Sequence, residues 1–297
     1  MKTIVIDGLG LIGGSLAMGI RKQWPNAKIY AVDTNRASLE FAKVQGIIDD
    51  GCDTLEDITR QADFIILATS VDLILTHLNV LSQLKLKRGA IVTDVGSTKK
   101  EIMEYSEPLI HQGISFIGGH PMAGSQRSGI HAARSDLFQE ANYFLIPHDE
   151  DIMSEQAMGQ IKELLNGLGV CWKQLSAEAH DRIVGQLSHL PHILAAGLVN
   201  RTKCEAEQMH FPIQYASSGF KSTTRIAASD PQMWTAILQS NSDILIEDIE
   251  RFESYLDEMK TALQKGDMEY ICRYFRQAKA IRTTLDQDKT YNSDRFR

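Results

Sequence analysis

His120 is a residue whose type and sequence surroundings could support chemistry. It stands in the run Gly118-Gly119-His120-Pro121-Met122-Ala123-Gly124-Ser125, directly after a short apolar stretch. A histidine in a turn is often an ordinary surface residue, but glycines allow the backbone to approach a ligand closely. Imidazole gains and loses its proton near neutral pH, so His120 is a candidate general acid or base.

A second polar segment, Thr93-Asp94-Val95-Gly96-Ser97-Thr98-Lys99, lies between a predicted strand and a predicted helix. Ser97 by itself is interpreted as the N-cap of that helix, because serine hydroxyls accept hydrogen bonds from the first free backbone N–H groups. Spacing alone therefore gives Ser97 a structural role.

The run Gly8-Leu9-Gly10-Leu11-Ile12-Gly13 has the spacing of a dinucleotide-binding turn. The pattern gains meaning here because it follows a predicted strand and opens a predicted helix. Its first glycine permits a tight turn, its second admits a pyrophosphate, and its third lets helix and strand pack closely. The helix N-terminus offers backbone N–H groups to the phosphates. The predicted cofactor-binding residues of this turn are Gly8, Gly10, Leu11, Ile12 and Gly13.

An acid stands where a dinucleotide site needs one. Asp33 ends the second predicted strand, where a carboxylate would accept hydrogen bonds from the adenosine ribose. The same charge repels a 2′-phosphate, so the sequence favours NAD over NADP, although Arg36 nearby could soften that preference. Thr69 and Ser70 follow a later strand and are supporting candidates for cofactor contact. The competing interpretation is a glycine-rich turn followed by a chance surface acid.

These residues depend on alternating strands and helices to position them. Short β-branched runs predict strands at Thr3–Ile6, Lys28–Val32, Phe64–Ala68, Ala90–Thr93, Ser115–Ile117 and Tyr143–Ile146. Amphipathic stretches predict helices at Leu11–Lys22 and Arg36–Val44. This order indicates an α/β fold in residues 1–175, with a doubly wound, mostly parallel sheet of the Rossmann type.

Residues 176–297 contain no convincing strand and are predicted to be all helical. Ser176 is expected to cap the first helix, and Pro191 to kink it. A later apolar seam consists of Leu245, Ile249, Phe252, Leu256, Met259 and Leu263. Its heptad-like spacing suits either packing within one domain or a contact between subunits, and the sequence leaves both open.

Composition narrows the classes of partner. The 297 residues carry a net charge of −7, which gives no general attraction to nucleic acid or to anionic membranes. Four cysteines are widely spaced, so zinc and CxxC redox patterns are absent, and we expect reduced thiols in the cytoplasm. The apolar run Ile4–Ile20 is broken by Asp7 and several glycines and is a poor membrane span.

Taken together, the segments resemble the prephenate dehydrogenase family over roughly residues 3 to 284. Besides the runs already given, the resemblance rests on Ser188-His189-Leu190-Pro191-His192, on Gly219–Ala227 and on Asp230-Pro231-Gln232-Met233-Trp234. It implies a homodimer in which a Rossmann domain is followed by an all-helical dimerisation domain that completes the active site.

The resemblance also implies a reaction and the residues that perform it. Prephenate would be oxidised at its ring hydroxyl by hydride transfer to NAD, and loss of CO2 would give 4-hydroxyphenylpyruvate, as in tyrosine biosynthesis. His120 matches the family's catalytic histidine and Ser97 the residue that orients it. No metal is required. The implied substrate-binding residues are Arg225, His192, Lys221, Trp234 and Ser188.

Several alternatives remain from the sequence. His189 and His192 could be a metal pair, although no third ligand follows at a recognisable spacing. Gln126 departs from the acidic or polar residue of many relatives, which puts a gating role there in doubt. We also expect that tyrosine, if it inhibits, competes at the active site, because no ligand-binding regulatory domain follows.

Three other functions compete with the leading one. Arogenate has an amine in place of the keto group of prephenate, and the sequence does not separate the two substrates. A β-hydroxyacid dehydrogenase would share the layout but needs a lysine in the stretch Asp181 to Asn200, which has none. A nucleotide-sensing protein without turnover would not need His120, Ser97 and Arg225 together.

Overall fold

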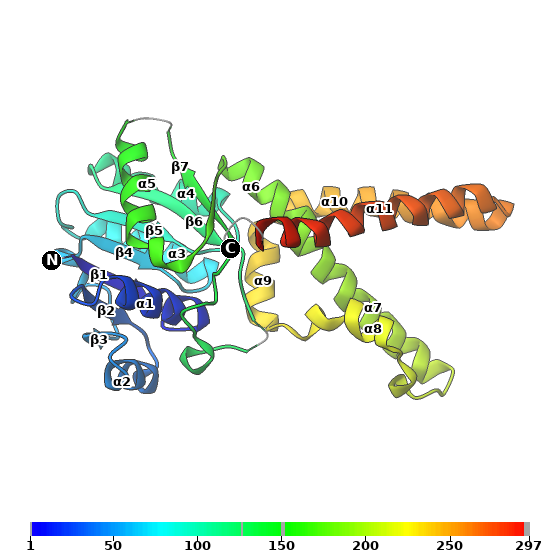
Figure 1. Ribbon diagram of the computed structural model, residues 1–297, viewed down its shortest axis with the longest axis horizontal. Coiled ribbons are helices and arrows are strands. Elements are labelled where there is room, and N and C mark those ends of the chain that lie inside the picture. The colour runs from blue at the N-terminus through cyan, green and yellow to red at the C-terminus, as the bar shows by residue number, and fades with distance from the viewer. Residues whose placement is uncertain (1, 126, 150–151, 294–297) are drawn as a thin grey trace. The chain divides into compact units, whose positions relative to one another are not determined.

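One eight-stranded sheet organises the first half of the chain in this computed structural model, which describes residues 2–125, 127–149 and 152–293 (Figure 1). The strands lie in the order β3-β2-β1-β4-β5-β6-β7-β8, and neighbours are parallel except for β6 and β7. Their bounds are β1 (Thr3–Asp7), β2 (Lys28–Val32), β3 (Asp50–Cys52), β4 (Phe64–Leu67), β5 (Ile91–Asp94), β6 (Ser115–Pro121), β7 (Asn142–Pro147) and β8 (Cys171–Gln174).

Helices cover both faces of this sheet. They are α1 (Leu11–Gln23), α2 (Arg36–Val44), α3 (Val71–Gln83), α4 (Lys100–His111) and α5 (Ile152–Leu164). Alternate residues of a strand point to opposite faces, so Ile4 and Ile6 pack with α1 and α5 while Val5 packs with α3 and α4. The predicted doubly wound, mostly parallel sheet is therefore confirmed.

The strand order places one crevice at the predicted nucleotide site. β1 is flanked by β2 on one side and by β4 on the other, so the direction of winding reverses between β1 and β4. Ligands of open α/β sheets bind outside the carboxyl ends of strands at such a reversal. The glycine turn follows β1 and Thr69 follows β4, so both border this crevice.

The structure corrects the predicted surroundings of His120. The strand expected at Ser115–Ile117 extends to Pro121, so His120 lies within β6 and is buried rather than in a turn. Pairing with the antiparallel β7 explains the extension, because His120 lies opposite Phe144 in the ladder. Gly119 is required by packing, since a Cβ there would lie 2.4 Å from the carbonyl oxygen of Asp94.

The second half is helical, and no strand occurs beyond Ser176 in the residues that the structure describes. Its helices are α6 (Ala177–Val184), α7 (Leu190–Gln208), α8 (Ser218–Thr223), α9 (Pro231–Ser240), α10 (Ser242–Lys265) and α11 (Met268–Ser293). Short 3-10 turns occupy Thr59–Gln61, Ile130–Ala132, Asn166–Leu168, Ile213–Tyr215 and Arg225–Ala228. No helix of the described part is long and apolar enough to cross a membrane.

The start of this helical half partly follows the prediction. The hydroxyl of Ser176 accepts a hydrogen bond from the backbone N–H of Ala179, which confirms the expected cap. The kink expected at Pro191 stays a prediction, and a π-helical stretch, Gly185–His189, interrupts the α-helix directly before α7. Proline has no N–H for the carbonyl four residues earlier, so the chain bonds differently in the turn that precedes Pro191.

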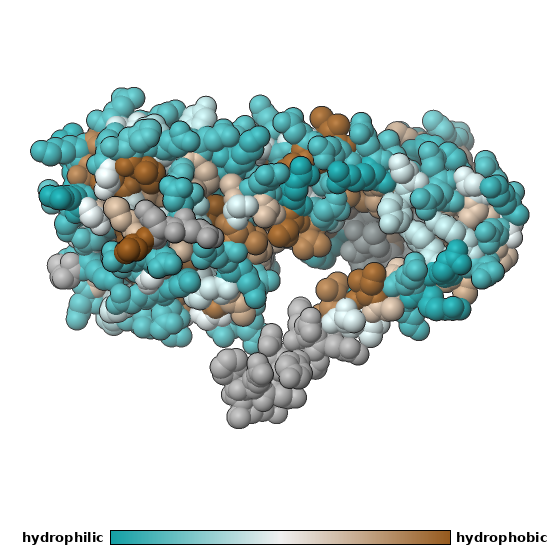
Figure 2. Space-filling view, turned by 90° about the horizontal axis from the view of Figure 1, so that it is seen from above, coloured by the Kyte–Doolittle hydropathy of each residue, from teal (hydrophilic) through white to brown (hydrophobic). Residues whose placement is uncertain are grey.

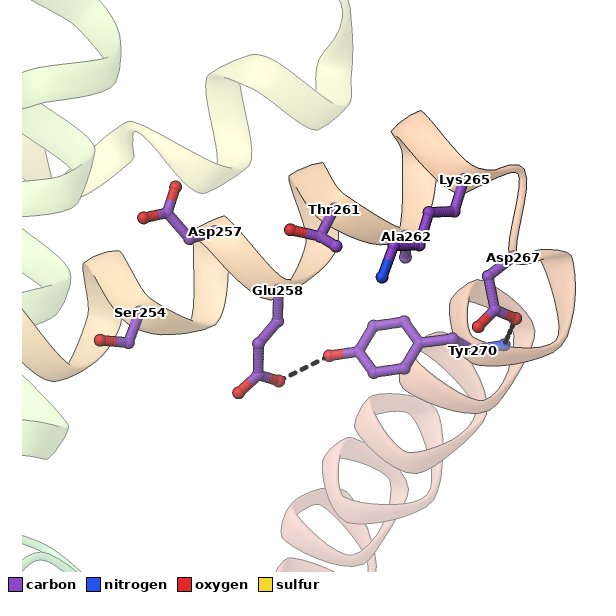
Figure 3. Close-up of a pocket in the computed structure, with 8 residues that line it drawn as sticks. All are labelled: Ser254, Asp257, Glu258, Thr261, Ala262, Lys265, Asp267 and Tyr270. Atoms are coloured by element: carbon purple, nitrogen blue, oxygen red, sulfur yellow. Dashed lines mark hydrogen bonds between the residues drawn. The ribbon is translucent and has the colours of Figure 1, made fainter.

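The chain divides into two compact units, Met1–Leu245 and Ile246–Arg297, so the predicted domain boundary after residue 175 stays a prediction. In the second unit, a shallow polar groove lies between α10 and α11 (Figure 3). There the Tyr270 hydroxyl donates a hydrogen bond of 2.8 Å to Glu258. None of the predicted site residues lines this groove, so it is not the candidate active site.

Large apolar side chains remain exposed along the helical half, and Figure 2 shows hydrophobic residues scattered over one face of the molecule. They include Leu187, Leu198, Tyr255, Leu256, Leu263 and Phe275. Leu256 and Leu263 belong to the predicted seam and are 52% and 61% exposed.

Asp181 joins the helical half to the sheet domain. Its carboxylate, 1% exposed, accepts hydrogen bonds from the backbone N–H groups of Lys99 (2.7 Å) and Lys100 (2.9 Å). These groups begin α4 and have no partner within that helix, so a residue 81 positions away from Lys100 supplies the cap. A carboxylate also complements the positive end of the helix dipole.

Replacement of this cap should destabilise the protein. We expect Asp181→Ala to lower the free energy of unfolding by about 2–4 kcal/mol, because it leaves two N–H groups and a histidine without an acceptor in a buried place. Denaturant unfolding measures the change. The matched control is Glu178→Ala, which removes an exposed ion pair with Arg182 and should cost less than about 0.5 kcal/mol. Equal stabilities of the two variants would refute the role of Asp181.

Candidate active site

The glycine turn after β1 fits a dinucleotide. Gly8 has a φ of +95°, which favours glycine, and a Cβ on Gly13 would lie 1.9 Å from the carbonyl oxygen of Gly8. A Cβ on Gly10 would meet nothing within 4 Å. Gly8 and Gly13 are therefore required by the turn itself, whereas Gly10 faces open space, as a glycine that admits a pyrophosphate should. Leu11 and Ile12 open α1 beside it.

Backbone hydrogen bonds orient the carboxylate of Asp33 beside this turn. Its two carboxylate oxygens accept hydrogen bonds of 2.8 Å from the backbone N–H groups of Leu9 and Asn35. Each oxygen keeps a second lone pair for a ribose hydroxyl. Arg36, which could have received a 2′-phosphate, instead lies 3.4 Å from a carboxylate oxygen of Asp53. These contacts fit NAD.

The end of β4 offers a further polar group. The Thr69 hydroxyl is buried and, among the residues that the structure describes, has no hydrogen-bond partner. A buried unpaired hydroxyl is costly in a folded protein, so a ligand that bonds to it would be stabilised. Ser70 precedes α3 and does not cap it with its side chain. Both positions suit a cofactor in the crevice.

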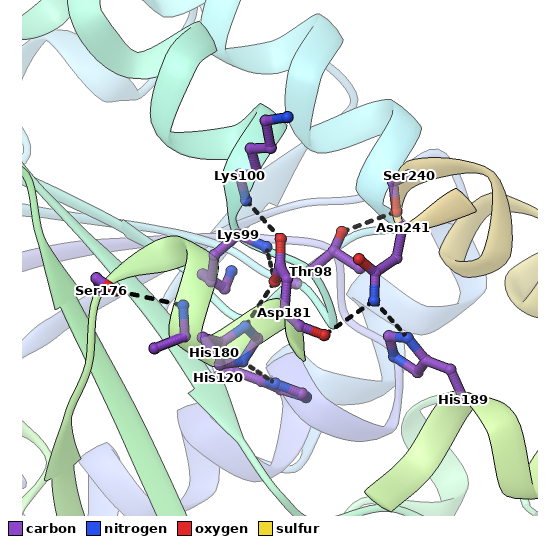
Figure 4. A network of polar contacts seen from close by, with 12 residues as sticks. Thr98, Lys99, Lys100, His120, Ser176, His180, Asp181, His189, Ser240 and Asn241 are labelled. Carbon is purple, nitrogen blue, oxygen red and sulfur yellow. Dashed lines mark hydrogen bonds and ion pairs between the residues drawn. The ribbon is translucent and has the colours of Figure 1, made fainter. Parts of the chain in front are cut away.

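A chain of buried polar groups surrounds His120 (Figure 4). Nδ1 of His120 lies 2.8 Å from Nε2 of His180, and Nδ1 of His180 lies 2.7 Å from a carboxylate oxygen of Asp181. Sequence reasoning gave His180 and Asp181 no role in the site. Nothing local marks them, because their burial and the contact with His120, 60 residues away, arise only in the folded chain.

Burial keeps these histidines neutral. The pKa of His120 is held well below its ordinary value, first by burial and then by the nearby His180 and by the ammonium group of Lys99. Burial also lowers the pKa of His180, against the opposing effect of Asp181. A neutral imidazole has a lone pair with which to accept a proton, so the surroundings of His120 suit a base.

A buried ion pair lies next to this chain. Lys99 and Asp94 are both fully buried and contact each other through ammonium and carboxylate. The same carboxylate accepts hydrogen bonds from the backbone N–H groups of Gly96 (2.7 Å) and Gly119 (3.0 Å). Asp94 thus ties the loop after β5 to β6, directly before His120.

Ser97 lies half-buried in the loop between β5 and α4, but within the described residues it makes no hydrogen bond to His120. His180 occupies Nδ1 of His120, so Ser97 would have to act at the other side of the ring. The orienting role of Ser97 stays a prediction.

The implied substrate residues form a second group. The rings of His192 and Trp234 stack with centroids 3.5 Å apart, and His189 meets the same indole edge-on at 5.9 Å. Burial lowers the pKa of His192, and the charge of Arg225 lowers it further, so Arg225 lies near this ring. Ser188 contributes its backbone carbonyl, which accepts a 2.9 Å hydrogen bond from His192.

Lys221 and Gln126 are the remaining residues that the sequence singled out. Lys221 is exposed on α8, and Gln126 lies outside the described residues. Asn241 lies 3.1 Å from Nδ1 of His189, whose pKa is lowered to about 4, chiefly by burial. In the described part of the chain, no group of three or more histidine, cysteine or acidic side chains is arranged to hold a metal ion.

Known proteins match this chain along nearly its whole length. Residues 16–173 match the family described as prephenate dehydrogenase, nucleotide-binding domain, and residues 176–277 match prephenate dehydrogenase, dimerization domain. The chain is similar to prephenate dehydrogenase of Bacillus subtilis (strain 168), with 37% identity over 95% of this chain and 76% of that protein. A relative from Lactococcus lactis subsp. cremoris (strain MG1363), also named prephenate dehydrogenase, is 39% identical over 97% of this chain and 79% of its own.

Solved structures agree with these matches. The structure of prephenate dehydrogenase from A. aeolicus in complex with hydroxyphenyl propionate and NAD+ superposes with a TM-score of 0.86 at 31% identity, covering 96% of this chain and 98% of that one. Synechocystis arogenate dehydrogenase gives a TM-score of 0.78 at 30% identity, with 95% and 99% covered. The glycine turn, the buried histidines and both halves of the chain thus agree with one assignment: the chain belongs to the prephenate dehydrogenase family.

Proposed function

We propose that this protein catalyses the NAD-dependent oxidative decarboxylation of prephenate to 4-hydroxyphenylpyruvate, a step of tyrosine biosynthesis. The proposal depends mainly on His120, which is buried and neutral. His120 lies on β6, next to β5, near the carboxyl ends of the parallel strands, where the nucleotide crevice also lies. Family membership and the relative solved with NAD+ and hydroxyphenyl propionate support it.

His120 has a defined task in this reaction. As the hydride leaves ring carbon C4 of the substrate, the C4 hydroxyl becomes acidic, and His120 accepts its proton. NAD, when bound, takes up the hydride. The carboxylate at C1 then leaves as CO2, its bonding electrons enter the ring, and His120 returns the proton to the phenolate oxygen. The protein therefore finishes the cycle in its starting protonation state.

The second group of residues suits a substrate with two carboxylates. Arg225 can bind one carboxylate with two parallel N–H donors, and Lys221 is our candidate for the other. His192 and Trp234 form an apolar wall with their stacked rings, and Ser188 fixes the orientation of His192. We assign Ser97 to the hydroxyl side of His120.

Arogenate is the second candidate substrate, because the chain is 30% identical to an arogenate dehydrogenase of known structure, against 31% for a prephenate dehydrogenase of known structure. The two substrates differ only in the side chain that bears the keto or amino group. The residues that face this group decide between them, and the ring chemistry at His120 would be identical.

We also propose a homodimer formed by the helical half, with the domain boundary after residue 175. The match to a dimerization domain over residues 176–277 supports the dimer and the boundary. The exposed apolar residues of the seam, Leu256 and Leu263, support the dimer. Tyrosine carries the phenol ring and a carboxylate of the product, so we propose that it competes for the pocket around Arg225.

The first test measures NADH formation by absorbance with NAD and either prephenate or arogenate. We expect turnover with prephenate, and His120→Asn should lower kcat by about 10²–10⁴-fold while NAD binding is kept, because the proton acceptor is lost. Turnover with arogenate alone would identify arogenate as the substrate and leave the proposed mechanism unchanged. Near-normal turnover by His120→Asn would exclude His120 as the base.

Cofactor choice gives a second prediction. Asp33→Ser should weaken NAD binding about 10–100-fold, because hydrogen bonds from the ribose to a charged acceptor are lost. The same variant should bind NADP better than the unaltered protein does, since the carboxylate no longer repels a 2′-phosphate. Titration with each cofactor measures both effects. An unchanged ratio of the two affinities would remove Asp33 from the site.

The glycine turn gives a matched pair of variants. Gly10→Ala should fold normally, because φ is −76° and its Cβ would meet no protein atom within 4 Å, yet it should bind NAD at least about tenfold more weakly. Gly13→Ala should lower the melting temperature, because its Cβ collides with the backbone of Gly8. If Gly10→Ala binds NAD as tightly as the unaltered protein, the pyrophosphate lies elsewhere.

A further inference from the structure

The position of one proton follows from the contacts of Asp181. An ionised carboxylate only accepts hydrogen bonds, and this one already accepts them from the N–H groups of Lys99 and Lys100. Nδ1 of His180 is 2.7 Å from the same carboxylate and must therefore donate to it. In a neutral ring the proton on Nδ1 leaves Nε2 with a free lone pair, so Nε2 of His180 is an acceptor.

The same reasoning extends to His120. Its Nδ1 lies 2.8 Å from Nε2 of His180, and two lone pairs would repel at that distance. Nδ1 of His120 therefore carries the proton, and Nε2 of His120 has the lone pair. A neutral imidazole in water prefers the other arrangement, with its proton on Nε2, so the protein has to impose this one.

We propose that His180 and Asp181 are positioning residues that hold His120 in the tautomer whose Nε2 can accept the proton of the substrate hydroxyl. This inference rests on the proposed dehydrogenase function, to which it adds the contacts that leave Nε2 of His120 free to accept a proton. Neither residue touches the substrate in this scheme, since both act through the ring of His120.

The charges around the chain act on the step that follows. When the hydroxyl proton moves to Nε2, its O–H bond breaks, an N–H bond forms, and His120 becomes a cation. The buried charges of this region are the carboxylates of Asp94 and Asp181 and the ammonium of Lys99, with His189 neutral at its lowered pKa. Burial, His180 and Lys99 oppose a positive charge on His120, so its ring holds the proton only until the product oxygen takes it back.

Asp181 is not required to take the proton. Its carboxylate lies at the N-terminus of α4 and already accepts hydrogen bonds from two backbone N–H groups and from His180. The proton therefore remains on His120 until it returns to the product oxygen. A chain that leaves the proton on His120 suits this reaction, because the overall step releases no proton to solvent.

The test compares two substitutions of His180. In His180→Gln, the amide oxygen can accept from Nδ1 of His120 and the amide N–H can donate to Asp181, so the tautomer is kept. In His180→Leu, neither contact remains. We expect kcat to fall less than about tenfold in the first and about 10²-fold or more in the second, with KM for the substrate little changed. Equal losses of kcat in the two variants would overturn the proposal.

A spectroscopic measurement tests the tautomer without turnover. In protein labelled with isotopic nitrogen in histidine, the His120 signals are identified by their loss in His120→Asn. The unaltered protein should show a protonated Nδ1 and an unprotonated Nε2, and His180→Gln should show the same. His180→Leu should shift toward protonation at Nε2. A proton on Nε2 of His120 in the unaltered protein would refute the inference, even if prephenate is turned over.

The control is a partly buried histidine that belongs to none of these contacts. His148 is hydrogen-bonded to Ser106 at 2.7 Å, and His148→Gln should leave kcat and the His120 signals unchanged. An inactive unaltered protein with the expected His120 tautomer would reject the proposed function and keep the assignment of the proton. Full activity in His180→Leu would reject the positioning role and keep the function.

Discussion

The buried carboxylate of Asp181 is the constraint on which the site depends. A buried charge is tolerated only when hydrogen bonds replace the lost water, and this one is satisfied by the start of α4 and by His180. The first contact fixes where α6 meets the start of α4. The second places His180 against His120. One carboxylate therefore connects the stability of the junction between α6 and α4 to the protonation of the candidate base.

The parallel sheet brings the other components to the same edge. β1, β4, β5 and β6 lie side by side and run in one direction, so the segments that follow them lie along one side. The glycine turn follows β1, Thr69 follows β4, Ser97 follows β5, and His120 is the last residue but one of β6. Binding of a hydride acceptor and placement of a base are thus consequences of strand order, before any specific contact is made.

The sequence predicted best what local patterns encode. The strand Lys28–Val32 and the helix Arg36–Val44 were predicted with their observed bounds, because apolar periodicity defines them, and in the structure Asn35 caps the helix. The edge strands β3 and β8 were missed, since Asp50–Cys52 and Cys171–Gln174 bury little and show no apolar alternation. His180 was missed for a different reason, because its partner lies 60 residues away and only the folded chain brings them together.

A dianionic substrate and a neutral base make opposite demands on one pocket. Cationic histidines would attract the two carboxylates, but a protonated His120 could not accept a proton. The structure separates the tasks by burial, which lowers the pKa of His120, His189 and His192. Positive charge is left to the guanidinium of Arg225 and the ammonium of Lys221. The histidines near the substrate can then act through the positions of their protons, and those positions are set by groups that the substrate never touches.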